Sequence, residues 1–184
     1  MYCDIVESFM NIISTKFNGL KIIKLKYFRD IRGYNLKIFE VENKLKFNCY
    51  ESYISQSVKG GVRGLHGQKG KFSQSKLIFC LKGSFLDVAI DIRKKSKTFG
   101  KIFKKKIIDH DGIALLIPKG FLHGIISLKK NTIIINYNSN RYNRKKELGV
   151  NIKSLGLKLP KMKLHMSEKD KKLKSLKEFL KTIK

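Results

Sequence analysis

The sequence predicts an all-β domain, a sandwich or a barrel, followed by one C-terminal helix. The middle of the chain consists of short apolar runs separated by turn residues. Residues 76–81 form one such run, residues 82–84 supply a turn, and residues 85–92 alternate between apolar and polar side chains. Short strands at this close spacing are typical of β-sandwiches and β-barrels.

Further strands are predicted downstream of these two. Their ranges are 101–108, 113–117, 121–128 and 132–138, with turn residues at 109–112, 118–120 and 129–131. The chain has 184 residues, only two prolines, no internal repeat and no linker. It is therefore expected to form a single domain over residues 1–184, with its core at about 18–160.

The C-terminal segment changes from strand to helix periodicity. Ser167 is a candidate N-cap, and Asp170 stands where a capping box would place an acidic side chain. Apolar residues then recur at helical spacing up to residue 183, and lysines occupy the opposite face. We expect a helix over about 167–183 that packs on the sheet. A membrane-surface helix is the less favoured alternative, because the apolar stripe is short and contains no tryptophan.

The strongly basic composition has two interpretations. A net charge of +27 is typical of proteins that bind nucleic acid or anionic lipid. Only six of the 41 basic residues are arginine, however, and arginine is the residue that reads bases and grips phosphates best. We therefore favour a solvated lysine coat and keep a nucleic-acid-binding β-barrel as the less favoured alternative.

Cysteine usage and hydropathy suggest a cytoplasmic protein. Cys3, Cys49 and Cys80 are an odd number with no close-spaced pair, so neither a disulfide framework nor a four-cysteine zinc site is expected. No apolar run approaches the roughly 18 residues of a membrane-spanning helix. The N-terminus also lacks the basic start and apolar core of a secretory signal.

Chemistry-bearing side chains gather in two short segments. Gly60–Gln68 contains Arg63, His66 and Gln68 on an expected strand after a glycine turn, and Lys76 follows ten residues after the histidine. A second histidine, His123, lies in Ile117–Gly124. A single histidine is more often structural than functional, so these residues alone raise the expectation of a site only modestly.

Several segments, taken in order along the chain, carry a resemblance to a known family. They run from about residue 18 to about residue 170: Phe28-Arg-Asp-Ile-Arg-Gly33, Arg63-Gly-Leu-His-Gly-Gln68, Ser75-Lys-Leu77, Phe85–Arg93, Ser96–Gly100, Ile117–Gly124, Leu155-Gly156 and Leu164–Asp170. This ordered set resembles the dTDP-4-dehydrorhamnose 3,5-epimerase family. The resemblance implies a cupin-type jelly-roll barrel with a C-terminal helix, a homodimer, and a role in deoxysugar and surface polysaccharide synthesis.

The resemblance also implies a reaction and site residues. The substrate would be a nucleotide-linked 4-keto-6-deoxy sugar, whose carbonyl acidifies the hydrogens at C3 and C5. A base removes one proton, and an acid on the opposite ring face returns one and inverts the carbon. His66 matches the base, and Lys76 matches a cation near the carbonyl. The matching substrate-binding positions are Arg32, which meets the nucleotide, and Arg63, Gln68, His123 and Glu147.

The proton donor depends on the register after His123. The family uses a tyrosine on the next strand, and a count without gaps reaches Asn136. One extra residue in the 129–131 turn moves the match to Tyr137. We prefer that register and expect Tyr137 to be the catalytic acid. Strand alternation allows only one of these two neighbours to face the barrel interior.

The sequence departs from the family pattern at three other positions. Ile152 stands where an aspartate is expected to orient the histidine, Lys37 replaces a glutamate, and Tyr53 replaces an asparagine on the strand before the histidine motif. A catalytically altered or inactive relative that binds a sugar nucleotide is therefore an alternative. No three-ligand metal set and no phosphate-cradling glycine loop is visible, so we expect neither a metal nor a cofactor.

Overall fold

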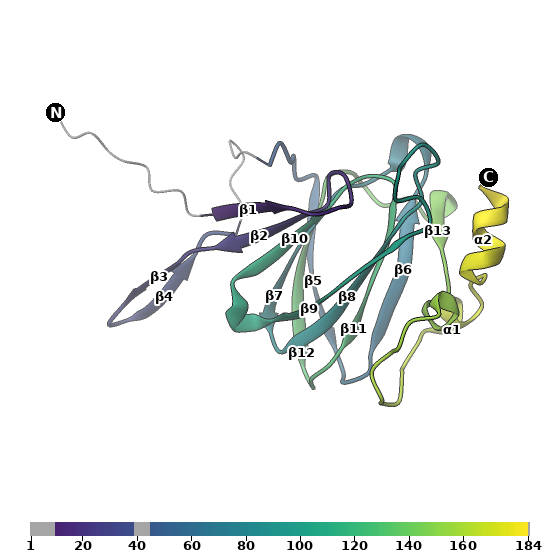
Figure 1. Ribbon diagram of the computed structural model, residues 1–184. Helices are drawn as coiled ribbons and strands as arrows, with labels where there is room; N and C mark the ends of the chain where they lie inside the picture. Colours follow the sequence, from purple (N-terminus) through teal and green to yellow (C-terminus); the bar gives the residue numbers. More distant parts are fainter. Residues whose placement is uncertain (1–9, 39–44, 184) are drawn as a thin grey trace.

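Two antiparallel sheets face one another across an apolar core (Figure 1). The computed structural model describes residues 10–38 and 45–183. The six-stranded sheet has the order β1-β2-β10-β7-β12-β5, and the five-stranded sheet has the order β13-β6-β11-β8-β9. The strands are β1 (Met10–Ser14), β2 (Lys21–Leu25), β5 (Glu51–Ser57), β6 (Val62–Gln68), β7 (Lys76–Lys82), β8 (Ser84–Asp91), β9 (Ile102–Ile108), β10 (Ile113–Ile117), β11 (Phe121–Ser127), β12 (Thr132–Asn138) and β13 (Glu147–Gly149).

The predicted central strands are confirmed to within one residue at each end. Alternation on β8 is also as predicted, because Phe85 and Ala89 lie in the core between the sheets while Val88 and Ile90 pack on the outer face. Together with the structural relatives described below, this arrangement confirms the predicted cupin-type jelly roll.

A separate hairpin extends away from the two sheets (Figure 1). It is formed by β3 (Tyr27–Asp30) and β4 (Gly33–Leu36), which pair with each other and with no other strand of the described residues. Its turn contains Arg32, whose side chain is 86% exposed and pairs with Asp30 at 2.6 Å. The hairpin therefore places Arg32 on a projection rather than between the sheets.

The C-terminal segment forms two short helices instead of the single predicted one. They are α1 (Glu168–Lys171) and α2 (Leu176–Thr182). The hydroxyl of Ser167 caps α1 as predicted, and a capping box of Ser175 and Glu178 begins α2. Phe179 packs α2 against the outer face of the five-stranded sheet, which confirms the predicted packing. Within the described ranges, no helix is long and apolar enough to cross a membrane.

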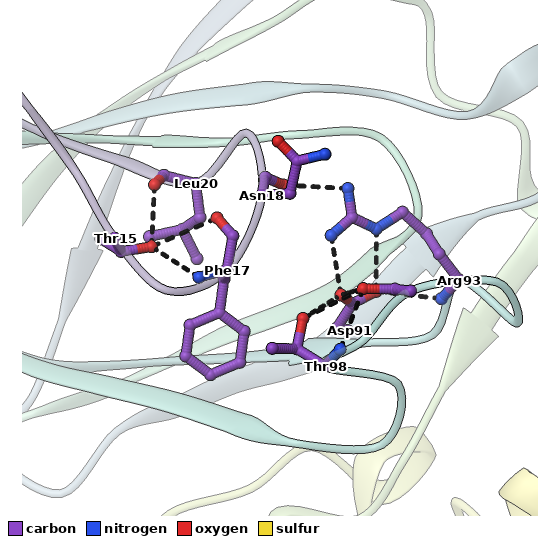
Figure 2. A network of polar contacts seen from close by, with 8 residues as sticks. Thr15, Phe17, Asn18, Leu20, Asp91, Arg93 and Thr98 are labelled. Atoms are coloured by element: carbon purple, nitrogen blue, oxygen red, sulfur yellow. Dashed lines mark hydrogen bonds and ion pairs between the residues drawn. The ribbon is translucent and has the colours of Figure 1, made fainter.

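A buried carboxylate fixes the loop that follows β8. Figure 2 shows Asp91 receiving hydrogen bonds from Arg93 and Thr98, and Ser96 donates a further one at 2.6 Å. Arg93 also donates to the carbonyl of Asn18, which ties the β1–β2 connection to this loop. Burial alone would raise the pKa of Asp91, but these donors outweigh it and hold the pKa at about 2.

Changing Asp91 to asparagine should lower the free energy of unfolding by about 3 kcal/mol, because Arg93 would lose its buried partner. The pKa of Asp91 is lower in the folded chain than its ordinary 3.8, so its stabilisation is complete above about pH 4 and declines as the pH falls toward 2. Urea unfolding of both proteins should therefore show a difference that shrinks over this range. Asp30→Asn removes an exposed pair of the same spacing and should change the midpoint little.

Candidate active site

An irregularity in β6 brings Arg63 and His66 to the same side of the sheet. His123 of β11 pairs with His66, and Ile125 pairs with Arg63, so β6 contains one extra residue between the two pairs. In a regular strand, residues three apart point to opposite faces, and a bulge cancels that alternation. Gly64 lies in the bulge at φ +107°, where a Cβ atom would be 2.6 Å from the His123 carbonyl oxygen. Only glycine fits this position.

His66 forms a short contact with a buried carboxylate. Its Nε2 lies 2.6 Å from Oδ1 of Asp170, which is only 3% exposed. The predicted capping box is therefore wrong for Asp170. Its carboxylate does not reach back to the start of its own helix but contacts the histidine. In the neutral ring, a hydrogen on Nε2 that is donated to Asp170 leaves Nδ1 as the nitrogen that can accept a proton.

The second nitrogen of His66 faces a different set of polar groups. Its Nδ1 lies 3.5 Å from Oε1 of Glu147, whose other oxygen accepts from the Tyr142 hydroxyl and from the Lys169 ammonium. Gln68 pairs with Glu147 across β6 and β13, and its side chain accepts from the backbone of Asn143. The predicted residues Gln68 and Glu147 thus lie beside His66.

A second histidine–carboxylate pair lies on the neighbouring strands. Nε2 of His123 is 2.7 Å from Oδ2 of Asp87, and both residues are buried. His123 is directly opposite His66 in the β-ladder. The structure therefore brings the two predicted histidines together, and each contacts its own aspartate.

Lys76 approaches these histidines from the six-stranded sheet. Burial lowers the pKa of its ammonium group, and the negative charges of Glu147, Asp87 and Glu51 partly offset that effect. No carboxylate of the described residues lies within ion-pair distance of it. A desolvated cation of this kind is placed to interact with negative charge that develops on a ligand.

Two adjoining hollows of about 330 Å³ each open between the sheets. Both are lined by His66, Lys76 and Tyr53. The first also reaches Arg63, His123 and Asp170, and the second reaches Gln68 and Glu147. Among the described residues, no group of three or more His, Cys, Asp or Glu side chains is arranged to hold a metal ion.

The structure corrects the expected position of the proton donor. Asn136 lines the first hollow, whereas Tyr137 packs with the apolar cluster on the outer face of the six-stranded sheet. The prediction that Tyr137 faces the barrel interior is therefore wrong. Asn136 and Tyr137 are consecutive on β12, so only one of them can point between the sheets, and that residue is Asn136.

Comparison with known proteins agrees with this geometry. The family model for dTDP-4-dehydrorhamnose 3,5-epimerase matches residues 14–178. The chain belongs to this family. A dTDP-4-dehydrorhamnose 3,5-epimerase of Shigella flexneri is 35% identical over 168 residues, 88% of this chain and 93% of that one. One of Methanothermobacter thermautotrophicus is 34% identical over 176 residues, covering 90% and 94%.

Solved structures give the same result for the fold. The epimerase of Sulfolobus tokodaii superposes with a TM-score of 0.86 at 36% identity, covering 92% of this chain and 97% of that one. The Legionella pneumophila enzyme, solved with dTDP-4-keto-L-rhamnose, gives 0.85 at 32% identity, covering 91% and 93%. The predicted membership of this epimerase family and the predicted class of enzyme, an isomerase, are confirmed.

This epimerase-family chain does have a carboxylate for its histidine. Ile152 is fully buried in the apolar cluster on the outer face of the five-stranded sheet, so its side chain lies outside both hollows. Ile152 does not leave His66 without an acidic partner, because Asp170 supplies the carboxylate. Asp170 and Asp87 lie in two of the segments that carry the family resemblance, but neither of them was predicted from the sequence to have a role in the site.

Two predicted arginines of the epimerase-family chain differ in placement. Arg63 lines the first hollow, with its Nε donating to the Ser57 hydroxyl and Nη2 donating to the Gln56 carbonyl. Arg32 lies on the projecting hairpin and lines neither hollow. Within one copy of the chain, the structure thus does not bring Arg32 together with the other predicted site residues.

Proposed function

We propose that this chain inverts a carbon next to the ketone of a dTDP-linked 4-keto-6-deoxy sugar. One observation carries the proposal: His66, held by the buried Asp170, faces a hollow that also contains the ammonium group of Lys76, which has no ion-pair partner among the described residues. A base and a cation in this arrangement suit the removal of a proton next to a carbonyl, because the negative charge that leaves the C–H bond moves to the carbonyl oxygen.

Each residue has a definite part in this step. Nδ1 of His66 accepts the proton, and Asp170 keeps the ring in the tautomer and orientation that leave this nitrogen free. Lys76 stabilises the enolate oxygen, and burial strengthens this interaction because it partly removes water from the ammonium group. His123 has one nitrogen on Asp87, which leaves its other nitrogen for the substrate.

The nucleotide part of the substrate is proposed from the relatives. One related structure contains dTDP-4-keto-L-rhamnose and another, from Bacillus anthracis, contains TDP and pyrophosphate. Arg63 on the wall of the first hollow supplies a guanidinium group, which suits a diphosphate. The product of the proposed reaction would serve deoxysugar synthesis, and we place the enzyme in the cytoplasm, where the free thiols of Cys49 and Cys80 stay reduced.

The test is deuterium exchange. The purified protein is incubated with dTDP-4-keto-6-deoxyglucose in D₂O, and proton NMR follows the signals of C3 and C5. We expect the signal of at least one of these positions to disappear, and the carbon that loses it identifies the site of proton removal. No exchange beyond that of a sample without protein would contradict the proposed function.

We also propose that the active form is a homodimer. The β3–β4 hairpin exposes Phe28, Ile31 and Tyr34, and Ile31 is exposed along its whole side chain. Apolar side chains on a projection are typical of a contact with another subunit. In such a dimer, Arg32 would reach a nucleotide bound to the partner subunit. Light scattering should give twice the mass of one chain, and a charged substitution at Ile31 should reduce it to the mass of a monomer.

A further inference from the structure

Inversion needs a proton donor on the side of the sugar opposite His66. His66 approaches the hollows from the five-stranded sheet, so the donor is expected on the six-stranded sheet. Asn136 occupies that wall, and a carboxamide does not release a proton at neutral pH. Tyr137 lies on the outer face of the same sheet. The reaction proposed above therefore lacks a donor at both positions that the sequence suggested.

A phenol is nevertheless present on this wall, one strand further along. Tyr53 of β5 is the direct cross-strand partner of Asn136 of β12, so the two side chains leave the sheet side by side on its inner face. Tyr53 lines both hollows, as His66 and Lys76 do. Lys76 belongs to the next row of the ladder, where it pairs with Asn138.

Other groups in the hollows are less suited to this role. The hydroxyl of Tyr142 donates to Glu147, and Glu147 belongs to the same sheet as His66. Glu51 is on the correct sheet, but it accepts a hydrogen bond from the side-chain amide of Asn138 and is held there as an acceptor. Among the described residues that line the hollows, Tyr53 is the one phenol on the wall opposite His66.

We propose that Tyr53 is the catalytic acid, and that this chain carries its proton-donating phenol on β5 instead of β12. The inference rests on the proposed function and deepens it. The family pattern has an asparagine at position 53 and a tyrosine on the strand of residue 136, and this chain has the two side chains the other way round. Because the two positions pair across neighbouring strands, the phenol moves by one strand spacing of about 4.8 Å.

The surroundings of Tyr53 keep its phenol protonated and oriented. Burial raises the pKa of the hydroxyl, a hydrogen bond with Asn138 and the charge of Arg63 lower it, and the charge of Glu51 raises it, with a net rise. The amide nitrogen of Asn138 also donates to Glu51 at 3.0 Å, while the amide oxygen has no hydrogen-bond partner among the described residues. Tyr53 is 46% exposed, so solvent can return a proton after each turnover.

The proposed step balances without a redox partner. His66 takes a proton from the carbon next to the ketone, and the electron pair of the C–H bond forms the enolate. The enolate carbon then takes the phenolic proton of Tyr53 from the opposite face, the carbonyl is restored, and the carbon is inverted. The tyrosinate regains a proton from water, and the imidazolium of His66 releases one to water.

Tyr53→Phe separates proton removal from proton return. The variant keeps His66 and should still exchange hydrogen for deuterium in D₂O within about tenfold of the wild-type rate, because the imidazolium can return a deuteron to the face it came from. Inversion should fall by roughly 10²- to 10⁴-fold. Proton NMR measures both, exchange from signal loss and inversion from the coupling constants of the new isomer. Tyr50→Phe, which removes a phenol that lines neither hollow, should match the wild type in both.

A second test moves the tyrosine from β5 to β12. Tyr53→Asn should lose inversion, and adding Asn136→Tyr to it should restore inversion to at least about a tenth of the wild-type rate, since the two side chains only change places. Binding of TDP, measured by calorimetry, should be unchanged in all variants and reports that each is folded.

The outcomes are distinguishable. Two results would overturn the assignment of Tyr53 and leave the proposed function standing. One is inversion at the wild-type rate in Tyr53→Phe. The other is an equal loss of exchange and inversion in that variant while it still binds TDP. Loss of inversion in Tyr137→Phe, with exchange retained, would overturn it in favour of the residue on the outer face. Absence of exchange in the wild-type protein would overturn the proposed function and this inference together.

Discussion

Replacing His66 with asparagine should lower the rate of deuterium exchange into the 4-keto sugar by roughly 10⁴-fold, the upper end of what one general base contributes. Asparagine has nearly the size of the imidazole ring and can donate to Asp170, so the fold should persist. It cannot accept a proton from carbon. Because exchange is the first step of the proposed reaction, inversion should fall by the same factor.

The matched control for this variant is His110→Asn. His110 is exposed, pairs with Asp109 and lines neither hollow. The His110→Asn variant should keep the wild-type rates of exchange and inversion. Exchange that survives in His66→Asn would show that another group removes the proton, and His123 would then be the first residue to replace.

Replacing Asp170 with asparagine should lower kcat for exchange by roughly 10³-fold and leave KM nearly unchanged. Asp170 acts through His66 and is a positioning residue, since its carboxylate contacts the ring nitrogen that faces away from the second hollow. An asparagine amide donates to that nitrogen instead of accepting from it, which favours the tautomer with the proton on Nδ1. The histidine is then unable to act as a base, as in other histidine–carboxylate pairs.

Glu168→Gln controls for the change of charge on the same short helix. Glu168 is exposed and pairs with Lys171, so this variant should keep the wild-type kcat. Asp170→Glu should recover part of the activity if the carboxylate is what the ring requires. A rise in KM without a fall in kcat would instead place Asp170 in substrate binding and contradict the positioning role.

The central strands could be predicted from the sequence, and the N-terminal ones could not. β7 to β12 alternate or run apolar between clear turn residues, so local pattern and tertiary structure agree. β5 has the sequence ESYISQS, in which polar side chains on the inner face serve the hollows and hide the usual alternation. β13 has only three residues and is defined by its pairing with β6. Strands of this kind form because neighbouring strands pair with them, and the sequence does not show which strands will be neighbours.

The site was predicted in part. The histidine motif predicted that His66, His123 and Lys76 share one site, and all three line the same hollow. Asp170 is 104 positions away from His66, and its local context as a helix start explained it fully before the fold was known. Tyr137 was expected on the wrong face because a shift of one residue on a strand moves every side chain to the other face. Tyr53 was noticed only as a departure from the family pattern.

The location of Asp170 has a consequence for synthesis of the protein. Every strand of the two sheets is complete by residue 149, yet the carboxylate that aligns the imidazole comes from Asp170 in α1, which begins at residue 168. A nascent polypeptide that has already assembled its barrel on the ribosome would still be unable to turn over substrate. A chain that stops between residue 149 and this turn would therefore hold His66 without the carboxylate that aligns it.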